Sequence, residues 1–292
     1  MSGALLARHQ IGELLERTSR TFALAIPLLP EPLRAQVGLG YLLFRIADTF
    51  EDASRWPRER RLQALASYDE WLEGRTNDDW KRLAREVPPI DDDGCLRLLS
   101  RADCVLATTR ALDRTAAAEL VAHTQKTVRG MARYVARQDE GGGLVLTQLA
   151  ELRDYAYVAA GIVGELLTRL FVLADARVAA VRDVLEAEAA SFGEALQLVN
   201  ILKDAPADRR EGRVYLPVNV PREVVIGIAR TDLVSASRYV KALRDANADR
   251  GVVAFCELPR RLAVASLDHI ERGTSKLARE EVMRIYAEVT RG

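Results

Sequence analysis

Cysteine and histidine are scarce in this chain of 292 residues, and neither sign of charge is in excess. The three cysteines form no CxxC pair and are odd in number, which favours free thiols in a reducing compartment over a disulfide framework. The three histidines lie far apart, which argues against a zinc site. With 42 basic and 42 acidic residues, the net charge of zero gives no reason to expect a nucleic acid partner. We expect a cytoplasmic protein whose anion binding is local.

Long apolar stretches are absent as well. The longest uncharged runs, residues 21–30 and 35–44, stop at ten residues, about half of the ~20 that a membrane-spanning helix needs. The N-terminal residues carry scattered charges and lack the apolar stretch of a signal peptide. No repeat and no low-complexity linker interrupts the chain. We therefore expect one domain over residues 1–292 and no segment that spans a bilayer.

What is present is a helical pattern. Leucine, alanine, arginine and glutamate dominate, apolar residues recur three and four positions apart, and alternating strand-like segments are nearly absent. The pattern is clearest at residues 59–75, 95–114 and 179–204. Turn residues gather at 85–94, 139–143, 205–213 and 216–223. The sequence predicts an all-α fold.

Two aspartates, Asp48 and Asp52, interrupt an apolar helical stretch, "YLLFRIADTFED" at residues 41–52. Residues four apart share one helix face with Cβ atoms about 5 to 6 Å apart, so the two carboxylates repel each other unless a cation lies between them. Mg²⁺ prefers carboxylate oxygens and takes only one or two from protein when phosphate and water complete its coordination. Taken alone, the spacing favours a solvated acidic helix face, and a magnesium site is the alternative.

A second polar series ends a later helix, within "LQLVNILKDAPADRREGRVYLP" at residues 196–217. Its members on nearly one side are Gln197, Asn200, Asp204 and Asp208. Asn200 can offer an amide oxygen to the same ion as the aspartates. Pro206 is expected to distort the last turn, which makes the position of Asp208 less regular. A helix end that runs into a polar loop is the alternative, but two such series in apolar helices favour metal binding.

Basic residues accompany both acidic series. They are Arg20, Arg45, Lys203 and Arg213. Because arginine forks match phosphate oxygens two at a time, the combination of acids and bases favours a metal-diphosphate site over calcium storage. Taken alone, each basic residue favours a surface ion pair over a diphosphate contact.

Small residues mark a third stretch, "YAYVAAGIVGELLTRLF" at residues 155–171. Ala160, Gly161 and Gly164 lie on adjacent turns, where another helix or an apolar ligand can come close. The tyrosines that can line an apolar cavity while offering hydroxyl groups are Tyr41, Tyr155 and Tyr157. Close helix packing and ordinary core tyrosines are the alternatives.

Taken in order, these segments resemble the squalene and phytoene synthase family, the head-to-head prenyl transferases. The matching segments are "SRTF" (19–22), 41–52, 155–164, 196–217 and "FCELPRRLAVASL" (255–267). The last of these is more similar to squalene synthases than to phytoene synthases. The resemblance spans roughly residues 19–267, and the paired acidic motifs with "GRVYLP" are its most specific part.

The resemblance implies a single-domain, all-α isoprenoid synthase (terpenoid synthase) fold, in which two aspartate-rich helices face each other across a central cavity. The implied Mg²⁺ ligands are Asp48, Asp52, Asn200, Asp204 and Asp208. The implied diphosphate-binding residues are Ser19, Arg20, Arg45, Lys203 and Arg213. The residues implied near the reacting carbons are Tyr41, Arg45 and Tyr155. The implied substrate pocket includes Phe22, Ala160, Gly161, Gly164, Gln197 and Asn200.

The implied activity is Mg²⁺-dependent condensation of two farnesyl diphosphates, through presqualene diphosphate, to squalene or a related C30 product. NADPH is required only if the product is squalene, and no strand followed by GxGxxG occurs. Phytoene synthase, which condenses two geranylgeranyl diphosphates, is the alternative. The extra five-carbon unit is worth roughly 3 to 4 kcal/mol of burial, so the depth of the cavity can decide the substrate, and the sequence does not show that depth. A non-catalytic family member is disfavoured because all four aspartates are present.

Three departures from the family pattern bear on these expectations. Lys203 stands where the family usually has arginine, so a point charge replaces a fork. "YAY" replaces the commoner "YC" pair, and we expect no counterpart of the long membrane-anchoring tail of eukaryotic squalene synthases. The expected location is cytoplasmic, with peripheral membrane contact for product release left open. The sequence does not indicate the oligomeric state.

Overall fold

The computed structural model describes residues 4–19, 22–75, 82–83, 86, 88, 90–274 and 276–291. Within these residues the chain is almost entirely helical, and its strands are the two-residue β1 (Leu144–Val145) and β2 (Arg213–Val214). The all-α prediction is therefore confirmed. The chain divides into two compact units: unit 1 is Met1–Ile26 with Glu31–Gly142, and unit 2 is Pro27–Pro30 with Gly143–Gly292. The expectation of one domain over residues 1–292 stays a prediction.

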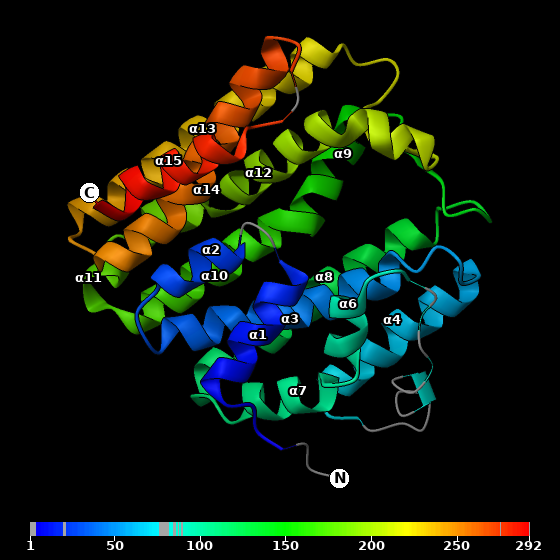
Figure 1. The fold of residues 1–292 in the computed structure, drawn as a ribbon, viewed down its shortest axis with the longest axis horizontal. Helices are drawn as coiled ribbons and strands as arrows, with labels where there is room; N and C mark the ends of the chain where they lie inside the picture. Colours follow the sequence, from blue (N-terminus) through cyan, green and yellow to red (C-terminus); the bar gives the residue numbers. More distant parts are fainter. Residues whose placement is uncertain are drawn as a thin grey trace. The chain divides into compact units, whose positions relative to one another are not determined.

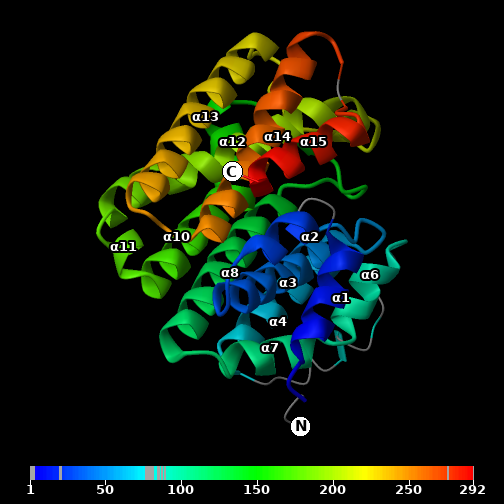
Figure 2. The same ribbon diagram turned by 60° about the vertical axis from the view of Figure 1, so that its left-hand side comes forward.

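Unit 1 is built around one apolar helix, α3 (Figures 1 and 2). Its helices are α1 (Arg8–Thr18), α2 (Phe22–Ala25), α3 (Leu33–Glu51), α4 (Arg58–Leu72), α6 (Asp93–Leu99), α7 (Ala102–Arg110) and α8 (Arg114–Val135), and the short η1 (Ile26–Leu28) follows α2. Helix α3 contacts α1, α4, α6, α7 and α8. Its residues Leu39, Leu42, Leu43, Ile46 and Phe50, spaced three, four and seven apart, are fully buried. This apolar stripe fixes the rotation of α3 and with it the face that carries the acidic motif.

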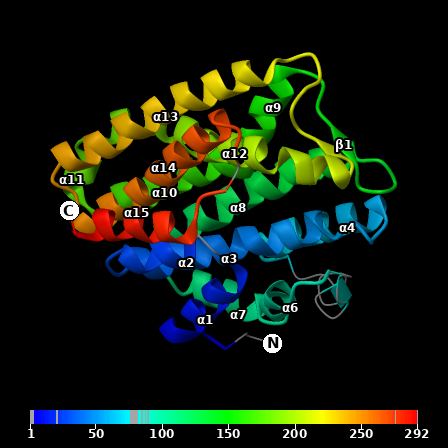
Figure 3. The same cartoon turned by 45° about the horizontal axis from the view of Figure 1, so that its top comes forward.

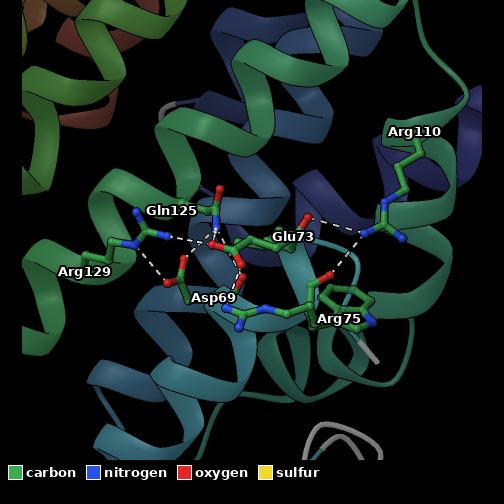
Figure 4. Close-up of polar contacts among 8 residues, drawn as sticks. Asp69, Glu73, Arg75, Arg110, Gln125 and Arg129 are labelled. Atoms are coloured by element: carbon green, nitrogen blue, oxygen red, sulfur yellow. Dashed lines mark hydrogen bonds and ion pairs between the residues drawn. The ribbon is translucent and has the colours of Figure 1, made fainter. Parts of the chain in front are cut away.

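A polar network ties α4 to α8 at the surface of unit 1 (Figure 4). Arg129 of α8 donates at 2.8 Å to Asp69 of α4 and at 2.9 Å to Glu73, the C-cap residue of that helix. Gln125, one turn earlier on α8, donates to the Asp69 carboxylate at 2.8 Å. Because the Arg129 side chain is 59% exposed, this network contributes little to stability and mainly sets the register of the two helices.

Unit 2 is a bundle of longer helices in which α12 lies along α13 and along the helix formed by α9, η2 and α10 (Figure 3). Its helices are α9 (Leu149–Ala156), the π-helical η2 (Tyr157–Gly161), α10 (Ile162–Ala174), α11 (Ala176–Ala179), α12 (Arg182–Arg210), α13 (Arg222–Asp245), α14 (Arg250–Glu271) and α15 (Arg279–Arg291). Strands β1 and β2 pair in parallel, with Leu144 opposite Arg213. This pairing holds the segment that follows α12 beside the segment that precedes α9.

Glycines allow α12 to approach its neighbour closely. A Cβ on Gly164 would lie 2.1 Å from the carbonyl oxygen of Ala189 on α12. A Cβ on Gly193 of α12 would lie 2.1 Å from the carbonyl oxygen of Ala160. Both distances are far below van der Waals contact, so the two backbones can meet at this distance only through glycine.

Two predicted boundaries were wrong. The turn expected at 205–213 begins only after Arg210, because α12 continues through Pro206, which removes one hydrogen bond from the last turns without ending the helix. The helix expected over 95–114 is broken twice, at residues 100–101 between α6 and α7 and at residues 111–113 between α7 and α8. The turn expected at 85–94 lies partly outside the described residues.

One helix is long and apolar enough to cross a membrane, by length and composition alone. It is the continuous segment Leu149–Ala174, and half of its most apolar window is buried inside the protein. The short uncharged runs of the sequence did not predict such a segment, because this window also contains charged residues. A buried core helix has the same length and composition, so the finding does not by itself indicate a membrane span.

Candidate functional site

The first acidic motif lies on the last turns of α3. Tyr41, Arg45, Asp48 and Asp52 follow one another at helical spacing, and Asp52 caps the helix with its backbone N–H on the Asp48 carbonyl oxygen at 2.8 Å. Arg45 lies between two acids, with Nη1 3.6 Å from Asp48 Oδ2 and Nη2 3.9 Å from Asp92 Oδ2. The structure therefore places Tyr41, Arg45, Asp48 and Asp52, all predicted site residues, on one face of the helix, where Arg45 is the counter-charge to the two aspartates.

The charge on this face is incompletely neutralised. The Asp48 side chain keeps 36% of its surface accessible, yet protein atoms crowd the carboxylate, and this burial is the main cause that raises its pKa to about 7. Repulsion from Asp52 raises the pKa further, and Arg45 opposes the rise. For Arg45, burial lowers the pKa, but the attraction of Asp48 and other neighbours outweighs burial and leaves the pKa raised. A cation bound here would relieve the repulsion between the two aspartates.

The end of α1 and the start of α2 lie against Tyr41. The Tyr41 hydroxyl donates to the Thr18 carbonyl oxygen at 2.7 Å, and its ring packs on Phe22 with 5.8 Å between ring centroids. Ser19 Oγ accepts from the Phe22 N–H at 3.1 Å. Burial raises the pKa of Tyr41, so the hydroxyl is protonated at neutral pH. Arg20, the remaining residue expected here, lies outside the described residues.

The second acidic motif lies on the last turns of α12, in unit 2. Lys203 Nζ donates to the Asn200 amide oxygen at 2.9 Å and lies 3.4 Å from Asp204 Oδ2. Gln197 lies one turn before Asn200 on the same helix and is half-buried. Lys203 thus bridges two of the predicted ligands.

Asp208 stays on the same helix because α12 continues past Pro206. Arg213 Nη2, on β2, lies 3.7 Å from Asp208 Oδ1 and 2.5 Å from Glu211 Oε2. Burial raises the pKa of Asp208, Arg213 opposes the rise, and Asp204 adds to it. Strand pairing between β1 and β2 holds the backbone of Arg213, so this cation is positioned by main-chain contacts.

The structure places the predicted tyrosine Tyr155 against a residue that the sequence analysis did not single out. Tyr155 on α9 stacks on Tyr215 with 4.6 Å between ring centroids, and the two hydroxyls lie 3.2 Å apart. The stack joins the start of the apolar helix to the segment that follows β2.

The small residues of the third stretch pack against protein. Gly164 and Ala160 meet α12 backbone, and a Cβ on Gly161 would lie 2.6 Å from the Tyr157 ring. Close helix packing, the alternative that the sequence left open, accounts for these contacts. Their place in a substrate pocket stays a prediction.

The two acidic motifs offer oxygen donors of the kind that magnesium prefers. Among the described residues, no three His, Cys, Asp or Glu side chains form a group that could hold a metal ion. The predicted oxygen donors are Asp48 and Asp52 on α3, and Asn200, Asp204 and Asp208 on α12. Mg²⁺ needs only one or two protein oxygens when phosphate and water supply the others. Burial, and after it repulsion from Asp52, raises the pKa of Asp48, and a divalent cation beside the two carboxylates would offset both effects.

Two residues of the site were missed by the sequence analysis. Asp92 caps α6 by accepting from the Cys95 N–H at 2.8 Å and also faces Arg45. Its cap role could have been found from an acidic residue just before an apolar run, whereas its contact with Arg45 is tertiary. Tyr215 lies inside the specific "GRVYLP" segment, and its aromatic ring was the available sign.

Comparison with known proteins decides the family. The squalene/phytoene synthase family pattern matches residues 15–225, more than half of the chain. The chain belongs to the squalene/phytoene synthase family. Squalene synthase ERG9 of Gibberella zeae is 27% identical to it over 301 residues, which cover 95% of this chain and 60% of that protein. The chain thus spans about 60% of the length of this curated relative.

Solved structures confirm the terpenoid synthase fold of this family member. The structure of TcSQS in complex with the ligand E5700 matches with a TM-score of 0.76 at 24% identity, covering 96% of this chain and 85% of that one. A dehydrosqualene synthase in complex with a ligand matches with a TM-score of 0.58 at 19% identity, covering 96% and 94%. The resemblance to squalene synthases found in the motifs is confirmed by the curated relatives.

Proposed function

We propose that this family member condenses two farnesyl diphosphates head to head, through presqualene diphosphate, to squalene or a related C30 product. The observation that carries the proposal is that both acidic motifs of the family are intact, each with a cation beside it. Arg45 lies 3.6 Å from Asp48, and Arg213 lies 3.7 Å from Asp208. The activity is inferred from relatives that are squalene synthases and that are longer than this chain.

In this proposal the oxygen donors of α3 and α12 hold Mg²⁺ ions. The donors are Asp48, Asp52, Asn200, Asp204 and Asp208. When bound, Mg²⁺ neutralises negative charge that builds on the leaving diphosphate. Metal ligands have to be deprotonated, so a bound Mg²⁺ would favour the ionised form of Asp48.

The cationic side chains bind the diphosphate oxygens. Arg45 contacts its two acids only at 3.6 and 3.9 Å, which leaves its guanidinium free to turn toward phosphate. Arg213 is held on β2 and presents a fork of the shape that diphosphate oxygens accept. Ser19 and Lys203 complete the diphosphate-binding set together with Arg20, which lies outside the described residues.

The aromatic residues act on the carbon skeleton. The stacked rings of Tyr155 and Tyr215 offer π faces that stabilise an allylic cation and exclude water. Tyr41 offers a protonated hydroxyl on the face of α3. In the first half-reaction one diphosphate leaves, the carbon that it leaves bonds to the double bond of the second substrate, and a proton is lost as the cyclopropane closes.

The second half-reaction releases the remaining diphosphate from presqualene diphosphate. A hydride from NADPH is then required if the product is squalene. The sequence contains no strand followed by GxGxxG. We propose a cytoplasmic location with peripheral membrane contact, because a C30 hydrocarbon has to be passed to lipid.

The decisive experiment supplies farnesyl and geranylgeranyl diphosphate separately with Mg²⁺, with and without NADPH, and identifies products by mass spectrometry. A C30 product from the C15 substrate is expected. Squalene that forms only with NADPH would show that the enzyme carries out the reductive step. Presqualene diphosphate would show that the reaction stops at the intermediate, and dehydrosqualene would show that it ends without reduction. A C40 product from the C20 substrate alone would instead identify a phytoene synthase. Absence of any condensation product would contradict the proposal.

A further inference from the structure

Arg61, on the first turn of α4, is the most deeply buried charged residue among those described, with 1% of its surface accessible. A buried charge is costly unless hydrogen bonds and opposite charges compensate it. Burial lowers the pKa of Arg61, and the nearby Glu51 opposes the change. A guanidinium in such a place therefore needs a structural or functional reason.

The hydrogen bonds of Arg61 are specific but incomplete. Its Nη1 donates to the Glu51 carbonyl oxygen at 3.2 Å and to the side-chain oxygen of Gln138. Its Nε and Nη2 atoms are buried without a hydrogen-bond partner among the described residues. Because unsatisfied buried donors lower stability, Arg61 is not explained as a stabilising core residue.

The position of the Glu51 carbonyl suggests a different role. Glu51 is the last residue of α3, where carbonyl groups have no partner within the helix. The carbonyl of Glu51 and the N–H of Asp52 belong to one planar peptide unit. Arg61 holds the oxygen of that unit, and the Asp48 carbonyl accepts from its N–H at 2.8 Å. The backbone of Asp52 is thus fixed at both ends of one peptide plane.

The charge of Arg61 acts on the same element. A cation at the C-terminal end of a helix interacts favourably with the helix dipole. Arg61 also interacts electrostatically with Asp52 itself. It is therefore placed to offset part of the repulsion between the two aspartates of α3.

We propose that Arg61 is a positioning residue for the acidic motif of α3: it locks the 51–52 peptide so that the Asp52 carboxylate is presented beside Asp48 for a divalent cation. The inference rests on the proposed function, because magnesium is the ion that the motif would hold. Arg61 itself touches neither metal nor substrate.

The chain supplies a matched control one turn earlier on α4. Arg58 donates to the backbone oxygen of the same Gln138 at 3.0 Å and pairs with Glu59 and Glu140. Its side chain is 31% exposed. None of these contacts reaches α3, so Arg58→Gln disturbs the contact with residue 138 without releasing the 51–52 peptide.

The test is calorimetric titration of Mg²⁺ into the protein in the presence of inorganic pyrophosphate. Arg61→Gln is expected to weaken Mg²⁺ binding by about 10- to 100-fold, the usual effect of losing a group that orients a metal ligand. Arg61→Lys is expected to fall between wild type and Arg61→Gln, because one ammonium group cannot hold both Glu51 and Gln138. Arg58→Gln is expected to bind as wild type does. Circular dichroism and thermal unfolding establish that each variant is folded.

Turnover provides a second readout. Raising the Mg²⁺ concentration should restore the rate of Arg61→Gln toward that of wild type, which a general loss of structure would not allow. Unchanged Mg²⁺ affinity in folded Arg61→Gln would overturn the inference. If that variant does not fold, unchanged affinity in Arg61→Lys would do so.

Failure of the inference is distinguishable from failure of the proposed function. Wild type that binds no Mg²⁺ with pyrophosphate would remove the proposed function and this inference together. Wild-type affinity in the Arg61 variants, combined with weakened binding in Asp52→Asn, would remove the positioning role alone.

Discussion

The two acidic motifs carry similar side chains but differ in how their charge is compensated. On α3, burial by protein atoms raises the pKa of Asp48 to about 7, and Arg45 lies 3.6 Å from its carboxylate. On α12, Lys203 bridges Asn200 and Asp204, and the Asp204 side chain is 50% exposed. A bound cation stabilises a poorly solvated, incompletely paired carboxylate more than it stabilises a carboxylate that is already paired and solvent-exposed. We therefore expect the α3 motif to depend more strongly on magnesium.

Substitution of a predicted ligand gives the largest expected effect and tests this difference directly. Asp48→Asn and Asp204→Asn should each lower kcat by about 10²- to 10³-fold, as loss of a group that stabilises transition-state charge does. The loss should be greater for Asp48. The measurement is steady-state turnover at saturating Mg²⁺, with circular dichroism to show that the helical fold is intact.

Asp69→Asn is the control for these variants. It removes a carboxylate from the surface network of α4 and α8 (Figure 4) and should leave turnover unchanged. Full activity in both Asp48→Asn and Asp204→Asn would contradict the metal assignment. Equal losses in the two variants would contradict the ranking of the motifs.

The acidic motifs could be predicted from the sequence because helical spacing alone places residues four apart on one face. The cations that compensate the charge of these motifs could not be predicted from the sequence. Arg58, Arg60 and Arg61 are near neighbours in sequence, yet only the tertiary packing of α4 on α3 buries Arg61 and leaves Arg58 partly exposed. The contact between Arg45 and Asp92 likewise joins residues 47 positions apart.

The course of α12 was also beyond the sequence pattern. A proline followed by polar residues is typical of a helix end, but α12 continues for four residues beyond Pro206. Local preference alone predicts that the helix ends near Pro206. Packing of α12 along its neighbours overrides this preference. As a result Asp208 shares a helix with Asn200 and Asp204.

A third acidic cluster, whose two carboxylates pair with one arginine, extends the comparison. Arg153 of α9 lies 2.7 Å from Glu194 and 3.2 Å from Asp232, both of which are buried. Arg153→Met leaves two buried carboxylates without their cation and should lower the free energy of unfolding by about 1 to 3 kcal/mol. Urea unfolding followed by circular dichroism measures the change.

The pH dependence of this loss has a definite sign. Burial raises the pKa of Glu194 and of Asp232, and Arg153 opposes both shifts. A carboxyl group with a raised pKa in the folded state stabilises the fold below its unfolded pKa, and this contribution is lost as the pH rises through the folded value. Removal of Arg153 raises both pKa values further, so the destabilisation should be greater at pH 8 than at pH 4. An equal loss at the two pH values would show that lost packing, not charge, is responsible.

The same reasoning predicts a smaller effect at Asp48 in the metal-free protein. Its pKa is about 7, against an ordinary value of 3.8, so its ionisation in the folded state lowers stability increasingly from about pH 4 to just above pH 7. Asp48→Asn should therefore have a higher Tm than wild type at pH 8, and the difference should vanish near pH 4. Adding Mg²⁺ with pyrophosphate should raise the Tm of wild type more than that of the variant. A variant that is less stable than wild type at pH 8 would contradict the excess charge proposed for α3.

Lys203→Arg is expected to give the smallest effect and tests the other side of the comparison. Arginine supplies the diphosphate fork that the family usually has here, so KM for farnesyl diphosphate should fall with kcat unchanged, by less than tenfold, since a partly exposed pair contributes at most about 1 kcal/mol. Lys241→Arg is the matched control, because Lys241 pairs with Asp245 on α13 and is 72% exposed; it should change neither constant. A large fall in kcat for Lys203→Arg at unchanged KM would mean that the compact ammonium group between Asn200 and Asp204 is itself required for catalysis. In that case the lysine would contribute more to the second motif than its metal ligands do.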